Sequence, residues 1–221
     1  MNEPFPGELE HLSNIEKEYF SKRVQFKINP LTTALIVVDL QNDFVALDAR
    51  VWIPDALRMI PKVKKLISNC RNLGVKIIYT AHVHHPYAMD RGLMGVFWPG
   101  ESIIEGTKGA EIFPDIKPMP EDKIVYKHRY SAFFQTDLDL TLRNLGIESV
   151  IICGTATNFC CESTARDAFY RDYQVIFLSD LNCTNNKEVH ENTLKTLRVG
   201  FALVIDSTEM LELLFTSSNK Q

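Results

Sequence analysis

Residues 149–168, SVIICGTATNFCCESTARDA, pass from an apolar run through a glycine turn into a helical pattern. The run at residues 149–153 is short and rich in β-branched side chains, as strands buried on both faces of a parallel sheet are. Gly154 and Thr155 form the turn, and residues 160–172 follow as a helix. A strand that leads directly into a helix is the unit of a parallel α/β sheet, so this stretch predicts that fold class.

Similar apolar runs recur along the rest of the chain. They occupy residues 33–39 (TALIVVD), 75–81 (VKIIYTA) and 174–178 (QVIFL), with weaker candidates at 123–127 and 202–205. Between them, apolar residues over 60–73 and 138–145 repeat at about 3.6 spacing, as in amphipathic helices. This alternation predicts a three-layer αβα sandwich with a mostly parallel, Rossmann-like central sheet of about six strands.

Two nearly identical pentapeptides mark helix ends. Residues 71–75 (RNLGV) and 143–147 (RNLGI) each follow a helical pattern and precede an apolar run. Glycine adopts the left-handed conformation that ends many helices, so we expect it at Gly74 and Gly146. Thr136 or Asp137 is expected to cap the helix that precedes Gly146.

Length, composition and charge indicate one domain with an added arm. The chain has 221 residues, of which 45% are hydrophobic and 24% charged, as in soluble globular proteins. We assign residues 1–30, with a polar helical pattern over 8–23, to an N-terminal arm, and residues 31–221 to the domain. The net charge of −4 disfavours a nucleic-acid partner. No apolar run approaches the ~20 residues of a membrane span, so no membrane association is expected.

The cysteines and the first residues predict a cytoplasmic protein. The five cysteines are an odd number without the spacing of a disulfide framework. The first 20 residues lack the basic and apolar regions of a secretory signal. We therefore expect reduced thiols in a reducing compartment.

Chemically active side chains follow the predicted strands at their carboxyl ends, where ligands bind in open α/β sheets. Asp39 and Lys127 each end an apolar run, and Cys160 lies in the first turn of the helix after residues 149–153. A helix N-terminus can stabilise a thiolate, a neighbouring carboxylate can serve as its base, and a lysine can hold either group by charge. Each residue also has a structural alternative. Asp39 could cap a turn, Lys127 could face solvent at the end of a strand, and Cys160 could be a small buried side chain.

Three motifs, in order along residues 31–206, resemble the isochorismatase-like cysteine hydrolase family. They are ALIVVDLQNDF around Asp39, KIVYKHRYSAF around Lys127 and GTATNFCCESTARDA around Cys160. The resemblance implies that Asp39 is the general base, Lys127 its partner and Cys160 the nucleophile, with no cofactor. Cys161 stands where the family usually has valine, which makes it a packing residue.

The resemblance has further structural implications. It implies a cis peptide bond between Thr155 and Ala156, and an oxyanion hole formed by the backbone N–H groups of Ala156 and Cys160. The expected assembly is a homo-oligomer, a dimer or a tetramer, that acts on a small-molecule substrate.

The motifs favour an amidohydrolase branch within this family. Vinyl-ether-cleaving isochorismatases lack the cysteine, so Cys160 argues for acyl transfer to a thiol. Nicotinamidases carry an Asp-x-His metal pair soon after the first strand, and residues 45–55 contain no histidine. Residues 127–134 are most similar to ureidoacrylate amidohydrolases, which belong with N-carbamoylsarcosine amidases. The expected reaction is cleavage of a small amide, ureido or carbamoyl substrate. The alternatives are an isochorismatase- or nicotinamidase-type hydrolase and a non-catalytic α/β binding protein.

Other residues near the predicted strand ends are candidates for contacting the substrate. Arg129 could clamp a substrate carboxylate, or pair with an acid of the fold such as Asp137 or Asp180. The long connection over residues 83–122 holds five of the ten prolines and is expected to form one wall of the site. The candidate substrate-binding residues are Gln41, Phe44, His84, Trp98, Arg129, Tyr130 and Thr155.

A histidine group follows residues 75–81. His82 and His84 share a face by the period of two along a strand, and with His85 they could bind a metal. The favoured interpretation is that they line the pocket or pack at its edge. We predict that the protein needs no metal.

Overall fold

The computed structural model describes residues 26, 28–47, 49–98 and 100–218. Six strands form one sheet in the order β3-β2-β1-β4-β5-β6, and every neighbouring pair is parallel. This is the strand order of a doubly wound Rossmann sheet, so the predicted fold class is confirmed. The strands are β1 (Thr33–Val38), β2 (Lys76–His82), β3 (Lys123–Lys127), β4 (Ser149–Thr155), β5 (Gln174–Cys183) and β6 (Leu203–Ile205).

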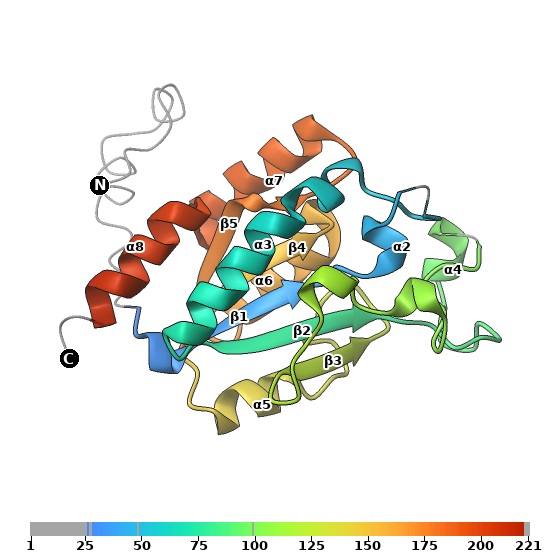
Figure 1. Ribbon diagram of the computed structural model, residues 1–221. Helices are drawn as coiled ribbons and strands as arrows, with labels where there is room; N and C mark the ends of the chain where they lie inside the picture. Colours follow the sequence, from blue (N-terminus) through green and yellow to red (C-terminus); the bar gives the residue numbers. More distant parts are fainter. Residues whose placement is uncertain (1–25, 27, 48, 99, 219–221) are drawn as a thin grey trace.

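Helices cover both faces of the sheet (Figure 1). On one face, α3 (Pro54–Asn72) and α8 (Ser207–Ser218) bury apolar side chains against alternate residues of the strands. On the other face, α5 (Leu138–Asn144), α6 (Glu162–Phe169) and α7 (Lys187–Gly200) do the same. No helix in the described ranges is long and apolar enough to cross a bilayer. The short helices are α2 (Asn42–Val45), α4 (Met94–Phe97), three 3-10 segments, η1 (Pro30–Thr32), η2 (Lys108–Ala110) and η3 (Pro114–Ile116), and the π-helical segment η4 (Thr157–Cys161).

The observed strands match the predicted runs closely, with two extensions. Both β4 and β5 continue beyond their apolar runs, and their pairing shifts register between Ile152 and Gly154. After the shift, Thr155 pairs with Cys183, so both strands reach the edge of the sheet where the candidate residues lie. The predicted helical pattern over 8–23, like most of the proposed arm, lies outside the described residues.

The predicted helix ends are confirmed. Gly74 and Gly146 have φ values of 83° and 65°, the left-handed conformation expected after α3 and α5. At the start of α5, the Thr136 hydroxyl accepts a hydrogen bond from the Leu138 N–H at 3.2 Å. Asp137 makes no side-chain cap there, so Thr136 is the capping residue.

Gly154 allows β4 to approach the end of β1. Its φ is 137°, and a Cβ atom at this position would lie 2.1 Å from the Val38 carbonyl oxygen. Val38 directly precedes Asp39, so the position of that carboxylate depends on this close backbone contact.

Gly154→Ala is expected to lower the free energy of unfolding by about 3–5 kcal/mol, because the added methyl group meets backbone rather than a movable side chain. Gly146→Ala is the matched control. Gly146 also has a positive φ, but no heavy atom would lie within 4 Å of its Cβ. Its expected loss is about 1–2 kcal/mol from the backbone conformation alone. Urea denaturation measures both, and equal losses would contradict the role of close approach.

Candidate active site

Four polar or nucleophilic side chains meet where neighbouring strands end. Asp39 follows β1, His82 and Lys127 are the last residues of β2 and β3, and Cys160 lies in η4 after β4. The sheet order places these four strands side by side. Asp39 and Lys127 are fully buried, and Cys160 is 5% exposed. The prediction that the acid, the lysine and the cysteine converge at one edge is therefore confirmed.

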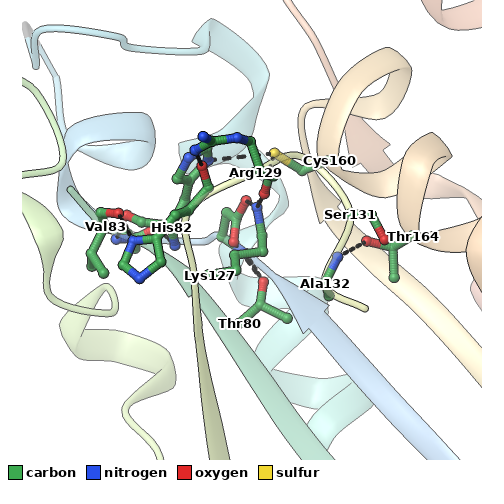
Figure 2. A network of polar contacts seen from close by, with 12 residues as sticks. Thr80, His82, Val83, Lys127, Arg129, Ser131, Ala132, Cys160 and Thr164 are labelled. Atoms are coloured by element: carbon green, nitrogen blue, oxygen red, sulfur yellow. Dashed lines mark hydrogen bonds and ion pairs between the residues drawn. The ribbon is translucent and has the colours of Figure 1, made fainter. Parts of the chain in front are cut away.

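Lys127 links the carboxylate to the thiol. Its Nζ donates a hydrogen bond to Cys160 Sγ at 3.3 Å (Figure 2). The same atom lies 2.7 Å from Asp39 Oδ2. Nζ also donates to the Arg129 carbonyl at 3.0 Å. The Thr80 hydroxyl donates to Asp39 Oδ1 at 2.5 Å and accepts from the Asp39 N–H at 3.1 Å. Both carboxylate oxygens are therefore engaged, and the orientation of the acid is defined.

The electrostatic environment keeps Cys160 protonated at rest. Burial raises the pKa of its thiol; the Lys127 ammonium opposes the rise, and Asp39 adds to it. Burial disfavours the charged form of Lys127, but the charge of Asp39 and the hydrogen bonds to Asp39 and Cys160 outweigh this and raise its pKa. We expected the helix start to stabilise a resting thiolate, but burial outweighs that effect. The sulfur therefore needs a base to become a nucleophile, and Asp39 lies within 4.8 Å of it.

The two adjacent cysteines have different environments. Cys160 borders the cavity described below, whereas Cys161 is fully buried in the core beneath α5, α6 and α7. Burial raises the pKa of Cys161 well above its ordinary value. Both lie in the π-helical segment before α6, rather than in the first turn of an α-helix as expected. All five cysteines are free thiols in the structure.

The turn between β4 and η4 has the expected backbone. The peptide bond between Thr155 and Ala156 is cis, as the family resemblance implied. Ala156 and Cys160 both border the cavity. Their role as an oxyanion hole stays a prediction.

A cavity of about 470 Å³ opens beside Cys160. The long connection over residues 83–122 forms one wall, as predicted, through Arg91, Met94 and Trp98 among others. The Trp98 indole N–H donates to the Tyr130 hydroxyl at 2.8 Å, which joins this wall to the segment after β3. Of the predicted substrate-binding residues, those that line the cavity are Phe44, His84, Trp98 and Tyr130.

The other three predicted substrate-binding residues do not line the cavity, because backbone groups occupy their side chains. The Gln41 amide donates to the carbonyls of His82 and Ala110 and accepts from the His82 N–H. The Thr155 hydroxyl donates to the Cys183 carbonyl at 3.4 Å. These hydrogen bonds of Gln41 and Thr155 hold the strand ends in place.

Arg129 makes neither of the contacts expected from the sequence, a substrate clamp at the cavity or an ion pair with Asp137 or Asp180. Its Nη1 donates to the carbonyl oxygens of Asp90 and His128 at 2.8 and 2.6 Å. It pairs with neither acid considered from the sequence, because Asp137 pairs with Lys123 and Asp180 with Lys62. The guanidinium holds the segment after β3, whose carbonyl at position 129 receives the Lys127 hydrogen bond.

The histidines form a second polar cluster. Asp90 Oδ1 lies 3.4 Å from His84 Nδ1, and Asp90 Oδ2 lies 3.0 Å from His128 Nδ1. Imidazole nitrogens and carboxylate oxygens of this kind are ligands of zinc and related cations. Asp39, His82 and Cys160 also offer ligand atoms within 4.8 Å of one another. His85 is separate, since its ring accepts from the Tyr87 N–H.

Several residues of the site were not predicted from the sequence. Thr80 is a polar residue inside an apolar run, but its link to Asp39 depends on the register that places it opposite Val38. Arg50, Arg91 and Phe159 line the cavity, although none directly follows a strand. Their placement depends on loop conformation, which has no simple pattern in the sequence.

Comparisons with known proteins show which sequences and folds this chain resembles. The isochorismatase-domain family model matches residues 33–209. Nicotinamidase 3 of Arabidopsis thaliana is 36% identical over 184 residues, which cover 82% of this chain and 88% of that protein. Ureidoacrylate amidohydrolase RutB of Caulobacter segnis is 32% identical over 174 residues, covering 69% and 73%. The crystal structure of a cysteine hydrolase from Pseudomonas syringae pv. phaseolicola superimposes with a TM-score of 0.85 and 31% identity, covering 88% and 97%.

Proposed function

Since this chain belongs to the isochorismatase family of hydrolases, we propose that it is a cysteine-dependent amidohydrolase. Its substrate is a small amide, ureido or carbamoyl compound, and the reaction passes through a thioester. The observation that carries the proposal is the buried chain of contacts from Asp39 through Lys127 to Cys160, which ends at the cavity. A chain that only bound ligands would have no need for this arrangement.

In the first step, Asp39 removes the proton from Cys160 Sγ as the sulfur attacks the carbonyl carbon. The oxyanion accepts hydrogen bonds from the N–H groups of Ala156 and Cys160. Asp39 then gives its proton to the leaving nitrogen, the C–N bond breaks, and ammonia or an amine departs. Lys127 stays an ammonium and stabilises the negative charge as it passes between carboxylate and sulfur.

In the second step, water hydrolyses the thioester. Asp39 takes a proton from the water as its oxygen attacks the carbonyl carbon. The C–S bond breaks, and the sulfur regains its proton from Asp39. The net reaction consumes one water, and the residues of this chain supply every proton transfer.

A nicotinamidase-type hydrolase is the second candidate. Two observations favour it: the 36% identity to Nicotinamidase 3 and the cluster of His84, Asp90 and His128. These three residues would hold a divalent cation, which would polarise or bind part of the substrate when present. The two candidates therefore differ in their dependence on metal.

A screen of amides, read as ammonia release, tests the proposal. We expect turnover of at least one ureido, carbamoyl or carboxamide substrate, and unchanged turnover after dialysis against a chelator. Cys160→Ala serves as the blank. Activity that a chelator removes and zinc, manganese or iron restores would favour the nicotinamidase type. Ammonia release that persists undiminished in Cys160→Ala would contradict the thioester route.

We also propose a cytoplasmic homo-oligomer. Large apolar side chains are exposed at Tyr87, Met89, Leu93, Val96 and Phe97, beside the cavity wall. A concentration of exposed apolar residues is typical of a contact surface.

A further inference from the structure

The cavity beside Cys160 has a one-sided charge. Among the residues that the structure describes, its lining includes Arg50 and Arg91 but no aspartate or glutamate. Below it, Asp39 and Lys127 form a fully buried pair whose formal charges cancel. A cavity with this balance favours a ligand that carries negative charge.

The two arginines are not equivalent. Arg50 is 60% exposed and lies 3.6 Å from the Glu101 carboxylate, so solvent and a neighbouring acid offset its charge. Arg91 is half-buried, and its Nε is buried without a hydrogen-bond partner. Its Nη1 donates to the neutral Gly100 carbonyl. Within the described ranges, no carboxylate forms an ion pair with Arg91, whereas Arg50 has the Glu101 carboxylate beside it.

One wall of the cavity is aromatic. Phe159, which directly precedes the nucleophile, lies 5.7 Å edge-on from Trp98 and 5.1 Å from Tyr130, measured between ring centroids. The hydrogen bond from Trp98 to Tyr130 fixes two of these rings relative to each other. A flat group beside Cys160 would pack against this wall. The volume of about 470 Å³ leaves room for a ring-sized acyl group in addition to the scissile amide.

We propose that the substrate is an amide whose acyl part carries a carboxylate, bound by Arg91, and a flat apolar body, packed against Trp98, Tyr130 and Phe159. This inference rests on the proposed amidohydrolase function and names the substrate class. Arg91 is thus the specificity-determining residue, and it occupies the role that the sequence suggested for Arg129. A guanidinium can bind a carboxylate through two parallel hydrogen bonds, which a neutral isostere cannot reproduce.

The test compares three kinds of amide. The 2-, 3- and 4-carbamoylbenzoates carry both features, 4-acetylbenzamide is a neutral aromatic analogue, and succinamate is an acid without a ring. We expect kcat/KM for one carbamoylbenzoate to exceed that for either comparison amide by at least about tenfold. Arg91→Gln is expected to lower kcat/KM for that acid by about 10–100-fold and to change the neutral amide by less than about threefold. Arg50→Gln should cause a smaller loss.

Two further measurements keep the outcomes separate. Arg58→Gln, at an exposed position on α3, is the matched surface control, and melting curves check that each variant is folded. Calorimetric binding of the same amides to Cys160→Ser tests recognition without turnover. Equal losses for acidic and neutral amides in Arg91→Gln, or equal binding of both, would overturn this inference. Absence of turnover of every amide, with the binding preference retained, would instead overturn the proposed function.

Discussion

Replacing Cys160 by alanine is expected to lower kcat by at least about 10⁴-fold, whereas Cys161→Ala keeps turnover within about threefold. Cys160 borders the cavity and receives the Lys127 hydrogen bond, while Cys161 is enclosed in the core. Removing the Cys161 sulfur leaves a small cavity that costs about 1 kcal/mol of stability. Ammonia release and melting curves measure both effects. Loss of turnover in Cys161→Ala with retention in Cys160→Ala would reverse the assignment.

Alkylation provides a second readout of the same residue. Because burial raises the pKa of Cys160, little thiolate exists at neutral pH in the free protein. The rate of labelling by iodoacetamide should therefore rise by about tenfold per pH unit from pH 7 to 9. Peptide mapping should place the first label on Cys160. A rate that levels off below pH 7 would show a resting thiolate and contradict the need for a base.

Asp39→Asn is expected to lower kcat by about 10²–10⁴-fold or more, because the amide cannot accept the thiol proton. The change also leaves the buried Lys127 ammonium without its anionic partner, which costs about 3–5 kcal/mol of stability. Turnover must therefore be measured below the melting temperature of the variant.

Two variants separate the lost base from the lost stability. The double variant Asp39→Asn with Lys127→Met removes the unpaired charge, so it should regain stability but not activity. Asp55→Asn, on the exposed surface of α3, should retain both. An Asp39→Asn protein within about tenfold of the parent rate would exclude Asp39 as the general base.

The strands of the sheet could be predicted from the sequence because each one depends on a pattern of a few consecutive residues. Short runs such as residues 33–38 and 149–153 are buried on both faces of the sheet. Their continuous apolar, β-branched side chains predict this burial without any knowledge of the rest of the fold. Gly74 and Gly146 mark helix ends for an equally local reason, since few other residues adopt their positive φ values readily. The convergence of Asp39, Lys127 and Cys160 followed from the rule that parallel strands bring their carboxyl ends to one edge.

The tertiary structure decided which side chains line the cavity and how burial and neighbouring charges shift the pKa values of Lys127 and Cys160. Gln41, Thr155 and Arg129 all lie near strand ends, yet backbone carbonyl groups occupy them, and no pattern in the sequence reveals those acceptors. Arg91 reaches the cavity through the path of a long loop. Burial, which depends on every packed neighbour at once, raises the pKa of Cys160 despite its place near a helix start. Local composition therefore determined the fold and the three convergent residues, whereas loop paths and burial, which are properties of the whole molecule, determined the pocket and its electrostatics.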